Sequence, residues 1–441
     1  MKKLILIIFI FISSHCSFDN KSGIWKNSNT VDLKKTDRFK DFETFYTKEK
    51  SFNKVIAPNK NLNLLLDPIK ITKQWLDEFY QESNNFDNFD YENLNELIFS
   101  SKKISRHKIK DKILFDGENV IVTDNKGNIV VYSVDKKEIT YKYNFYKKKF
   151  KKIKKNLNII IEENIIYASD NLGYFYALNY KNEKLLWAKN FKIPFRSNIK
   201  IFGNKIITAD QDNILHILNK FNGVQLKFIP TEETIIKSDF INSLALYKDT
   251  LIYLNTFGSL YSINSQNSKI NWFANFKQSL DLTPANLFYS NPVVIFKDKI
   301  IVSTDPYLYV LDINNGSIIF RISITSIVKP VVSGKNLFII TKDNLLVCIN
   351  INTGKIIYSL NIAKEIADFL DTKNKSISIK SLSLANNNLL IFLDNSYLVA
   401  FNKNGKIEKI EKLKSKLGTF PIFINKSILF LNKKNKLIVL N

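Results

Sequence analysis

Residue types that perform catalysis or bind metals are scarce in this sequence. Its 441 residues include only three histidines and two cysteines. His15 lies in an apolar N-terminal stretch, His107 lies just before a region of repeats, and His216 lies within a predicted strand, NILHILN. Histidines placed in this way do not supply the ligand set of a zinc site. We expect His216 to fill the core or the wedge between two sheets.

The acidic residues give no catalytic pattern either. The pairs Glu162–Glu163 and Glu232–Glu233 lie in predicted turns, where a solvated charge is the ordinary role. The GxSxG, HExxH and phosphate-binding glycine-loop motifs do not occur. Cys348 lies within the predicted strand LLVCIN, where it is expected to be a small buried hydrophobe. We therefore predict a protein that is not an enzyme and that needs neither a cofactor nor a metal.

The sequence does specify strands, and they recur in a repeat. Asn164 to Phe191 reads as strand, turn, strand, turn, strand, with alternating aromatic and aliphatic residues and the turn DNLG. The 34 Phe and 19 Tyr, with abundant Ile, also favour strands. Similar units recur about every 45 residues. Aligned on the residue that ends the second strand of each unit, they fall at Ser133, Asn179, Asn219, Asn264, Asp312, Asn350, Asn402 and Asn441.

Two further positions of the repeat predict how neighbouring units pack. The position eight residues after the aligned one is usually aromatic, and a large ring there is expected to fill the wedge between adjacent sheets. Its occupants are Tyr141, Trp187, Lys227, Trp272, Phe320 and Tyr358. Glycine stands four residues after the aligned position at Gly223, Gly316 and Gly354, where a turn with positive φ is expected.

A weaker strand precedes each unit, which makes four strands per repeat. Four-stranded sheets repeated radially form a β-propeller. The predicted fold is therefore all-β, an eight-bladed β-propeller with four-stranded antiparallel blades over residues 71–441. The last unit ends after its third strand at Asn441, so we expect Glu96 to Ile104 to supply the missing outer strand and close the ring. Ile71 to Asn95 is expected to be a short ordered segment that packs on the ring.

The N-terminus has the features of a secretory leader. Two lysines, an apolar run and small polar residues precede Cys16, which predicts a lipoprotein-type signal peptide over residues 1–16 with lipidation of Cys16. An ordinary signal peptide with an incidental cysteine is the alternative, because His15 is unusual before a lipidated cysteine. Residues 17–70 show no periodicity and are predicted to be a flexible tether.

The net charge of +24 allows two interpretations. One is binding to nucleic acid or an anionic membrane. The other is compositional bias, because the excess is mostly Lys and is spread over turns and strand ends. Its densest cluster, Lys147 to Lys155, falls between two repeats. No nucleic-acid-binding motif accompanies the charge. We therefore predict no nucleic-acid partner.

The segment YASDNLGYFYALNYKNEKLLW resembles the PQQ-type propeller repeat. Eight such repeats after a lipoprotein-like leader are similar to the BamB family of outer-membrane assembly lipoproteins. This resemblance implies a scaffold on the periplasmic side of the outer membrane, held there by a lipid anchor. It would act as a monomer within a complex, bind the barrel-inserting protein BamA and assist insertion of outer-membrane proteins. A further hypothesis is that exposed blade edges bind unfolded client chains by strand addition.

The same resemblance implies a partner-binding site. In the BamB family, BamA docks on a loop with an apolar residue followed by Arg, and on an acidic loop one blade later. The segment IPFRSNIKIF matches the first loop at Pro194, Phe195 and Arg196, and IIKSDFINSLAL matches the second at Asp239. The second acidic position of the family is Ile241 here. Alternatively, Phe195 covers a blade edge and Arg196 is a solvated loop charge.

Two other functions remain open at this point. PQQ-type repeats also occur in quinone-dependent oxidoreductases, which as a family need calcium-binding carboxylates, a catalytic Asp and commonly a vicinal disulfide. This sequence has no adjacent cysteines. A generic envelope propeller that binds another protein is the second alternative.

Overall fold

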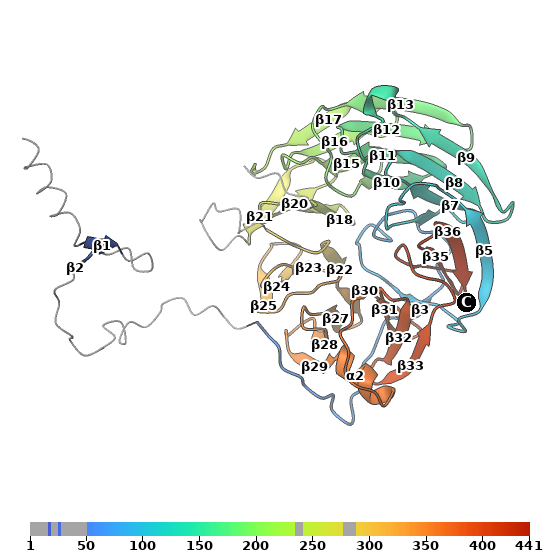
Figure 1. Ribbon diagram of the computed structural model, residues 1–441. Helices are drawn as coiled ribbons and strands as arrows, with labels where there is room; N and C mark the ends of the chain where they lie inside the picture. The colour runs from blue at the N-terminus through green and yellow to red at the C-terminus, as the bar shows by residue number, and fades with distance from the viewer. Residues whose placement is uncertain (1–15, 19–24, 28–50, 234–240, 277–287) are drawn as a thin grey trace, which may run out of the picture. The chain divides into compact units, whose positions relative to one another are not determined.

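Short hydrophobic segments separated by Asp, Asn and Gly turns form antiparallel sheets around a ring (Figure 1). The computed structural model describes residues 16–18, 25–27, 51–233, 241–276 and 288–441. The chain divides into two units, Met1–Lys50 and Ser51–Asn441. In the first unit, β1 (Cys16–Phe18) pairs antiparallel with β2 (Trp25–Asn27). The second unit contains the ring.

The described strands of the second unit form eight blades, which confirms the predicted eight-bladed propeller. Blades 1 and 2 are β6 (Leu114–Phe115), β7 (Asn119–Thr123), β8 (Asn128–Ser133) and β9 (Glu138–Asn144), then β10 (Leu157–Glu162), β11 (Ile165–Asp170), β12 (Tyr174–Asn179) and β13 (Lys184–Asn190). Blades 3 and 4 are β14 (Lys200–Phe202), β15 (Lys205–Ala209), β16 (Leu215–Asn219) and β17 (Gln225–Ile229), then β18 (Ser243–Tyr247), β19 (Thr250–Leu254), β20 (Ser259–Asn264) and β21 (Ile270–Asn275).

The second half of the ring repeats this order from the centre outward. Blades 5 and 6 are β22 (Val294–Phe296), β23 (Lys299–Ser303), β24 (Leu308–Asp312) and β25 (Ile318–Ile322), then β26 (Val331–Ser333), β27 (Asn336–Ile340), β28 (Leu345–Asn350) and β29 (Ile356–Asn361). Blades 7 and 8 are β30 (Ile379–Ala385), β31 (Asn388–Leu393), β32 (Tyr397–Asn402) and β33 (Ile407–Lys412), then β34 (Ile422–Ile424), β35 (Ser427–Leu431), β36 (Lys436–Leu440) and β5 (Leu97–Lys103). The aligned residues of the repeat end the third strand of blades 1–7, and Asn441 directly follows that strand in blade 8.

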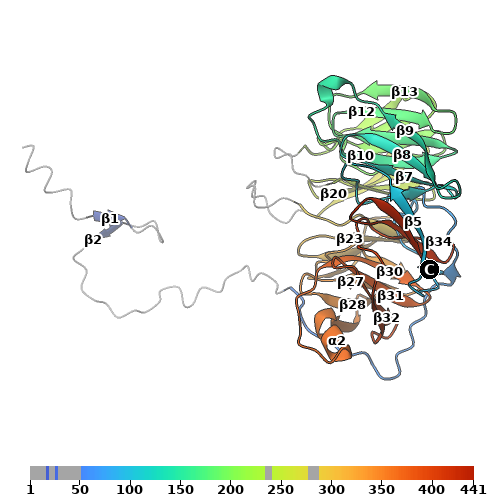
Figure 2. The same ribbon diagram turned by 45° about the vertical axis from the view of Figure 1, so that its right-hand side comes forward.

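Strand β5 closes the ring, as predicted. It comes before the first blade in sequence but pairs antiparallel with β36, the last strand of the chain, with Ser100 opposite Ile438 and Phe99 opposite Val439. Figure 1 shows β5 beside β36, and Figure 2 shows β5 against the red C-terminal strands. Because the two ends of the propeller share one blade, β36 is not left with an unpaired edge.

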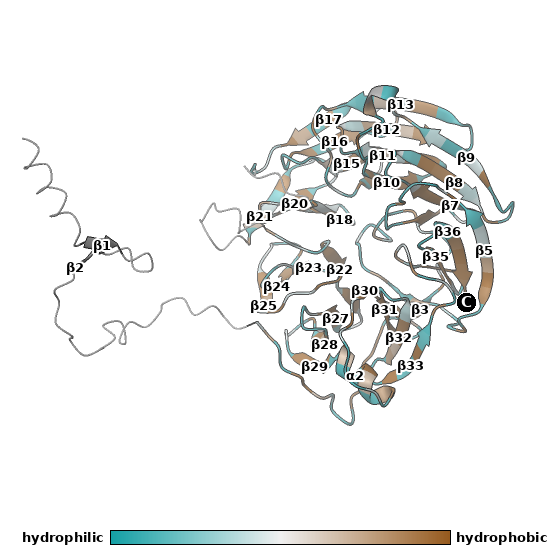
Figure 3. Ribbon diagram, in the orientation of Figure 1, coloured by the Kyte–Doolittle hydropathy of each residue, from teal (hydrophilic) through white to brown (hydrophobic). Residues whose placement is uncertain are grey.

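The core lies between blades and not within them. Inner strands such as β7 and β27 are buried at every residue, whereas outer strands such as β9 alternate between exposed and half-buried residues. Figure 3 shows the same division, with brown on the inner strands and teal on the outer strands and turns. The faces of adjacent sheets therefore bury one another.

The predicted wedge aromatics do contact the following blade. Trp187 of blade 2 donates a hydrogen bond from Nε1 to the carbonyl of Lys220 in blade 3 at 3.0 Å, and its ring packs on Gly223. Trp272 makes the same two contacts with Ile313 and Gly316 in blade 5. Lys227 has no ring, but its ammonium donates a hydrogen bond to the carbonyl of Ser268 at 2.5 Å. It therefore reproduces the hydrogen bond to the next blade without the ring contact.

The segment before β5 occupies the centre of the ring (Figure 1). We name residues 73–92 the plug segment. It contacts the inner part of every blade in ring order, which extends the prediction that Ile71 to Asn95 packs on the ring. The contacts are Trp75 with Phe115, Leu76 with Ile161, Asp77 with Lys200, Glu82 with Leu246, Ser83 with Ile295, Asn85 with Val332, Phe89 with Asn386, and Glu92 with Lys426.

The predicted tether is too long at its C-terminal end. Residues 51–70 already contact the propeller, so the boundary lies at Lys50/Ser51 and not at residue 70. The amide of Ile56 bonds to the carbonyl of Ser359, and Leu64 is buried in the core around blades 6 and 7. Strand β3 (Ile69–Lys70) pairs parallel with β4 (Asn88–Phe89), which pairs parallel with β30. Backbone pairing and single apolar contacts hold this stretch, and neither produces a periodic pattern.

Helices are short. The 3-10 helix η1 (Lys148–Phe150) lies between blades 1 and 2, and α2 (Ile362–Phe369) lies between β29 and β30. The side chain of Asn361 caps α2 by accepting a hydrogen bond from the amide of Lys364 at 3.0 Å. Among the described residues, no helix has the length and apolar character needed to cross a membrane.

Candidate partner-binding site

The loop that carries Pro194, Phe195 and Arg196 joins β13 of blade 2 to β14 of blade 3. All loops of this kind lie on one face of the ring, because successive strands of a blade alternate in direction. We call this face the inter-blade loop face. The loop is held by backbone hydrogen bonds from Gln211 to the carbonyl of Pro194 at 2.8 Å and from Arg196 to the carbonyl of Ala209 at 3.0 Å. It is therefore presented as a fixed surface.

Phe195 is not the exposed aromatic that the sequence led us to expect. Its side chain is only 2% exposed and lies between blades 2 and 3. Its ring meets those of Phe175, Phe191 and His216 edge-on, at centroid distances between 5.3 and 5.6 Å. The alternative, that Phe195 covers a blade edge, is correct. Strand β12 and the loop supply an apolar pocket at this position, so burial outweighs exposure.

Pro194 and Arg196 remain half-buried at the surface. The carbonyl of Arg196 accepts a hydrogen bond from the amide of Asn242 at 2.8 Å, and Ser197 forms a parallel bridge with Asn242. Asn242 also donates from its side chain to the carbonyl of Asp210 at 2.7 Å. The loop that precedes β18 therefore lies directly beside the Arg196 loop.

Asp239, the fourth predicted residue of the site, lies outside the described residues. Both ends of its loop are described and are anchored. The carboxylate of Glu232 accepts hydrogen bonds from Ser259 at 2.8 Å and from Tyr261 at 2.7 Å, and Asn242 holds the other end. Glu232 is thus a structural residue of blade 4 and not a free turn charge. The hydrogen bonds that it accepts outweigh burial and lower the pKa of its carboxyl.

Ile241 is a residue of this surface whose role the sequence does not indicate. By sequence it is only a departure from an acidic position of the family, but in the structure it is 53% exposed. It directly precedes Asn242, which bonds to Arg196, so an apolar side chain does lie near the arginine at this surface. The residue pattern offered no signal for this, because the two residues are neighbours only through the contact between blades 3 and 4.

The histidine and cysteine positions have structural roles. His216 is buried, with Nε2 at 2.8 Å from a carboxylate oxygen of Asp210 and Nδ1 at 3.1 Å from the side-chain oxygen of Gln225. It fills the wedge between blades, as predicted. Cys348 is buried and free, and burial raises the pKa of its thiol. Within the described ranges, no three His, Cys, Asp or Glu side chains gather in a way that could hold a metal ion.

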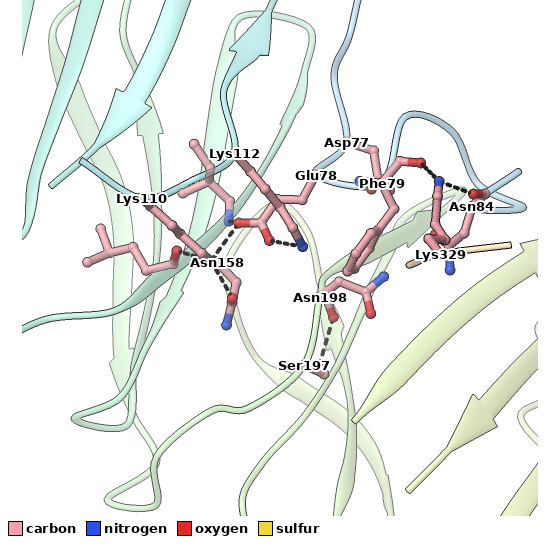
Figure 4. A network of polar contacts seen from close by, with 12 residues as sticks. Asp77, Glu78, Phe79, Asn84, Lys110, Lys112, Asn158, Ser197, Asn198 and Lys329 are labelled. Atoms are coloured by element: carbon pink, nitrogen blue, oxygen red, sulfur yellow. Dashed lines mark hydrogen bonds and ion pairs between the residues drawn. The ribbon is translucent and has the colours of Figure 1, made fainter. Parts of the chain in front are cut away.

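Ion pairs fasten the plug segment in the centre of the ring (Figure 4). The carboxylate of Glu78 forms ion pairs with the ammonium groups of Lys110, at 2.9 Å, and of Lys112, at 3.5 Å. Burial alone would raise the pKa of Glu78, but these two lysines and its hydrogen bonds outweigh burial and hold that pKa below its usual range. Asp77 pairs with the fully buried Lys200 at 2.6 Å. Burial lowers the pKa of Lys200, although Asp77 partly opposes this effect.

Residues 147–360 match the family model described as outer membrane protein assembly factor BamB. The crystal structure of BamB from Moraxella catarrhalis is similar, with a TM-score of 0.62 and 13% identity over 78% of this chain and 99% of that chain. A comparison with curated protein sequences gives no match.

Two quinone enzymes have similar folds. A europium-containing methanol dehydrogenase gives a TM-score of 0.61 at 11% identity, covering 83% of this chain and 89% of that chain. Quinohemoprotein alcohol dehydrogenase from Comamonas testosteroni gives 0.61 at 9% identity, covering 84% and 81%. At these identities the likeness shows the fold alone.

Proposed function

We propose that this chain, which is a BamB-like propeller of PQQ-type repeats, is a non-enzymatic scaffold of the outer-membrane barrel-assembly machinery. It binds a BamA-like protein through the inter-blade loop face and assists insertion of outer-membrane proteins. A lipid on Cys16 holds it on the periplasmic side of the outer membrane. The match of residues 147–360 to the BamB family model carries this proposal, because those residues include the whole candidate site.

The contact surface proposed for the partner is centred on Arg196. Pro194 lies beside it in the loop, Asp239 belongs to the neighbouring loop, and Ile241 adds the exposed apolar side chain that Phe195 does not provide. Arginine is over-represented among the residues that contribute most to the binding free energy of protein interfaces, and such residues lie in apolar surroundings. The anchored backbone of the Arg196 loop reduces the conformational entropy that is lost on binding.

Charge reversal at Arg196 tests this surface. We expect Arg196→Glu to weaken co-purification with the BamA-like protein from detergent-solubilised outer membrane by roughly 30-fold or more, the effect of a residue worth about 2 kcal/mol. Ile241→Ser should weaken it by a smaller factor. Arg106→Glu is the matched control, since Arg106 is an exposed arginine in the loop between β5 and β6 on the same face.

The result is informative only if the fold is intact, which an unchanged melting temperature of each variant would establish. Equal loss of binding in Arg196→Glu and Arg106→Glu would indicate a general charge effect and contradict the site. Photo-crosslinks from the Arg196 loop that reach only proteins other than barrels would contradict the scaffold function itself.

A quinone-dependent oxidoreductase is the second candidate, favoured by the fold shared with methanol dehydrogenase. Purified protein incubated with PQQ and Ca²⁺ should then retain the quinone chromophore after gel filtration. On the scaffold function proposed above, the protein elutes without it.

A further inference from the structure

A cavity of about 280 Å³ lies at the centre of the ring, above the plug segment. Its floor is formed by the plug residues Trp75, Phe79 and Phe86. Its walls are formed by residues of the innermost strands and of the loops before them, including Ile113 just before β6 and Leu382 within β30. Most of the lining is apolar. A small concave site with apolar walls and a few polar groups is the usual form of a small-molecule site.

Three lysines enter this cavity, each against an aromatic ring. The ammonium of Lys112 lies 3.3 Å from the ring centroid of Phe79, that of Lys329 lies 3.4 Å from Phe86, and that of Lys380 lies 4.9 Å from Phe420. The rings attract the charged heads and hold them at the wall. Figure 4 shows Lys112, Phe79 and Lys329 around this part of the plug segment.

Positive charge exceeds negative charge here. Glu78 is the only carboxylate among the described lining residues, and it already serves Lys110 and Lys112. Lys329 donates to the carbonyls of Phe79 and Asn84, but neither it nor Lys380 has a carboxylate within 4.0 Å in the described part of the chain. Lys380 has no hydrogen-bond acceptor there either.

This excess is energetically unfavourable in the absence of a ligand. Burial, with repulsion from Lys200 and Lys112, lowers the pKa of Lys329 well below its usual range. Burial likewise lowers the pKa of Lys112 to about 8, although Glu78 opposes this effect. An anion in the cavity would stabilise the charged form of each lysine. The site therefore favours a negatively charged group.

A bulge in β30 lies at the wall of the cavity. Ile379 pairs with Leu393 and Ser381 pairs with Phe392, so Lys380 is the extra residue. Residues 380–383 all line the cavity, so this stretch of β30 forms one of its walls and carries Lys380.

We propose that this cavity binds a small apolar molecule that carries one carboxylate. Lys329 and Lys380 hold the carboxylate. The apolar body packs against Trp75 and the apolar walls. A single carboxylate fits this pair of donors, and a cavity of about 280 Å³ has room for a body of about two fused rings. The two lysines that hold the carboxylate are not part of the proposed partner surface, but Ile241 of that surface also lines the cavity.

Calorimetry with 2-naphthoate as the probe and 2-naphthamide as its neutral counterpart tests the proposal. Residues 51–441 form a compact unit of their own and are suitable protein for the titration. We expect 2-naphthoate to bind at least about tenfold more tightly than 2-naphthamide, because hydrogen bonds between an ammonium and a carboxylate are stronger than those between an ammonium and a neutral amide. Lys380→Met should reduce that preference and leave the affinity for 2-naphthamide unchanged.

Lys412→Met is the matched control, because Lys412 also lies over a ring, that of Tyr397, but outside the cavity. It should leave both affinities unchanged, as should Arg196→Glu. The proposal is overturned if neither probe binds at millimolar concentration, if the two probes bind equally, or if Lys412→Met has the same effect as Lys380→Met. Loss of partner binding in Arg196→Glu with retained 2-naphthoate binding would show that the two sites are separate.

Discussion

Gly223 shows at the scale of one residue why the repeat needs glycine in its outer turn. Its φ of 69° lies in the left-handed region, and a Cβ at this position would stand 2.4 Å from the ring of Trp187 in the preceding blade. Gly316 meets Trp272 in the same way at 2.5 Å. The glycine therefore serves both the turn and the contact between blades, whereas the sequence indicated only the turn.

Substitution at Gly223 separates these two roles. We expect Gly223→Ala to lower the free energy of unfolding by about 2–4 kcal/mol, because overpacking against Trp187 adds to the cost of the left-handed conformation. Gly203→Ala is the matched control, since Gly203 has a φ of 57° and nothing within 4 Å of the added Cβ. It should cost only about 1 kcal/mol. Urea unfolding followed by tryptophan fluorescence measures both, and equal losses would contradict the wedge contact.

At the scale of elements, the plug segment ties the blades to one another. The side chain of Asn84 donates to the carbonyls of Leu244 in blade 4 and Val293 in blade 5, at 2.9 and 2.8 Å. Its oxygen accepts from Lys200 of blade 3 at 2.7 Å. One residue with a φ of 62° thus connects three blades. The plug segment has little backbone pairing of its own, so these contacts with inner strands determine its path.

Breaking the buried pair between Asp77 and Lys200 should loosen this element. Lys200→Met leaves the carboxylate of Asp77 buried without its partner, which costs about 3–5 kcal/mol of folding free energy. The double variant Lys200→Met with Asp77→Asn removes the unpaired charge, and we expect it to recover more than about 1 kcal/mol. Denaturant midpoints of the single and double variants measure the difference. No recovery in the double variant would mean that the pair does not hold the plug segment through its charge.

At the scale of the whole molecule, the ring is a closed object whose last blade combines both parts of the chain. Strand β5 contributes seven residues to a blade whose other strands lie more than 300 positions later. Closure leaves the inner strands of every blade covered on both faces. An open ring would expose an apolar sheet face and the edge of β36, which is a site for aggregation.

Two truncated chains test the role of closure. A chain that begins at Asn93 keeps β5 but lacks the plug segment, and a chain that begins at Arg106 lacks both. We expect the Arg106 chain to be the less stable by roughly 3–5 kcal/mol, since it loses the strand pairing of β5 at about 1 kcal/mol per hydrogen bond. It should also elute from gel filtration as aggregates. Equal denaturant midpoints for the two chains would contradict closure by β5.

Local sequence determined the repeat, the number of blades and the wedge contacts. Alternation with a period of two and turns rich in Asp, Asn and Gly are local properties, so Asn179 and its counterparts mark the ends of third strands without reference to the rest of the fold. Trp187 could be assigned to a contact with the next blade because the repeat fixes which face of the strand it occupies. The closing strand followed from counting strands, since the last unit was one strand short.

Tertiary structure alone decided the burial of Phe195, the path of the plug segment and the central cavity. Each depends on groups that are distant in sequence, as when Asn84 bonds to Leu244, 160 residues later. Phe195 has the composition of an exposed contact, but the rings of Phe175 and His216 surround it once blades 2 and 3 pack together. Burial depends on what lies opposite a side chain in space, and a strand pattern carries no information about that.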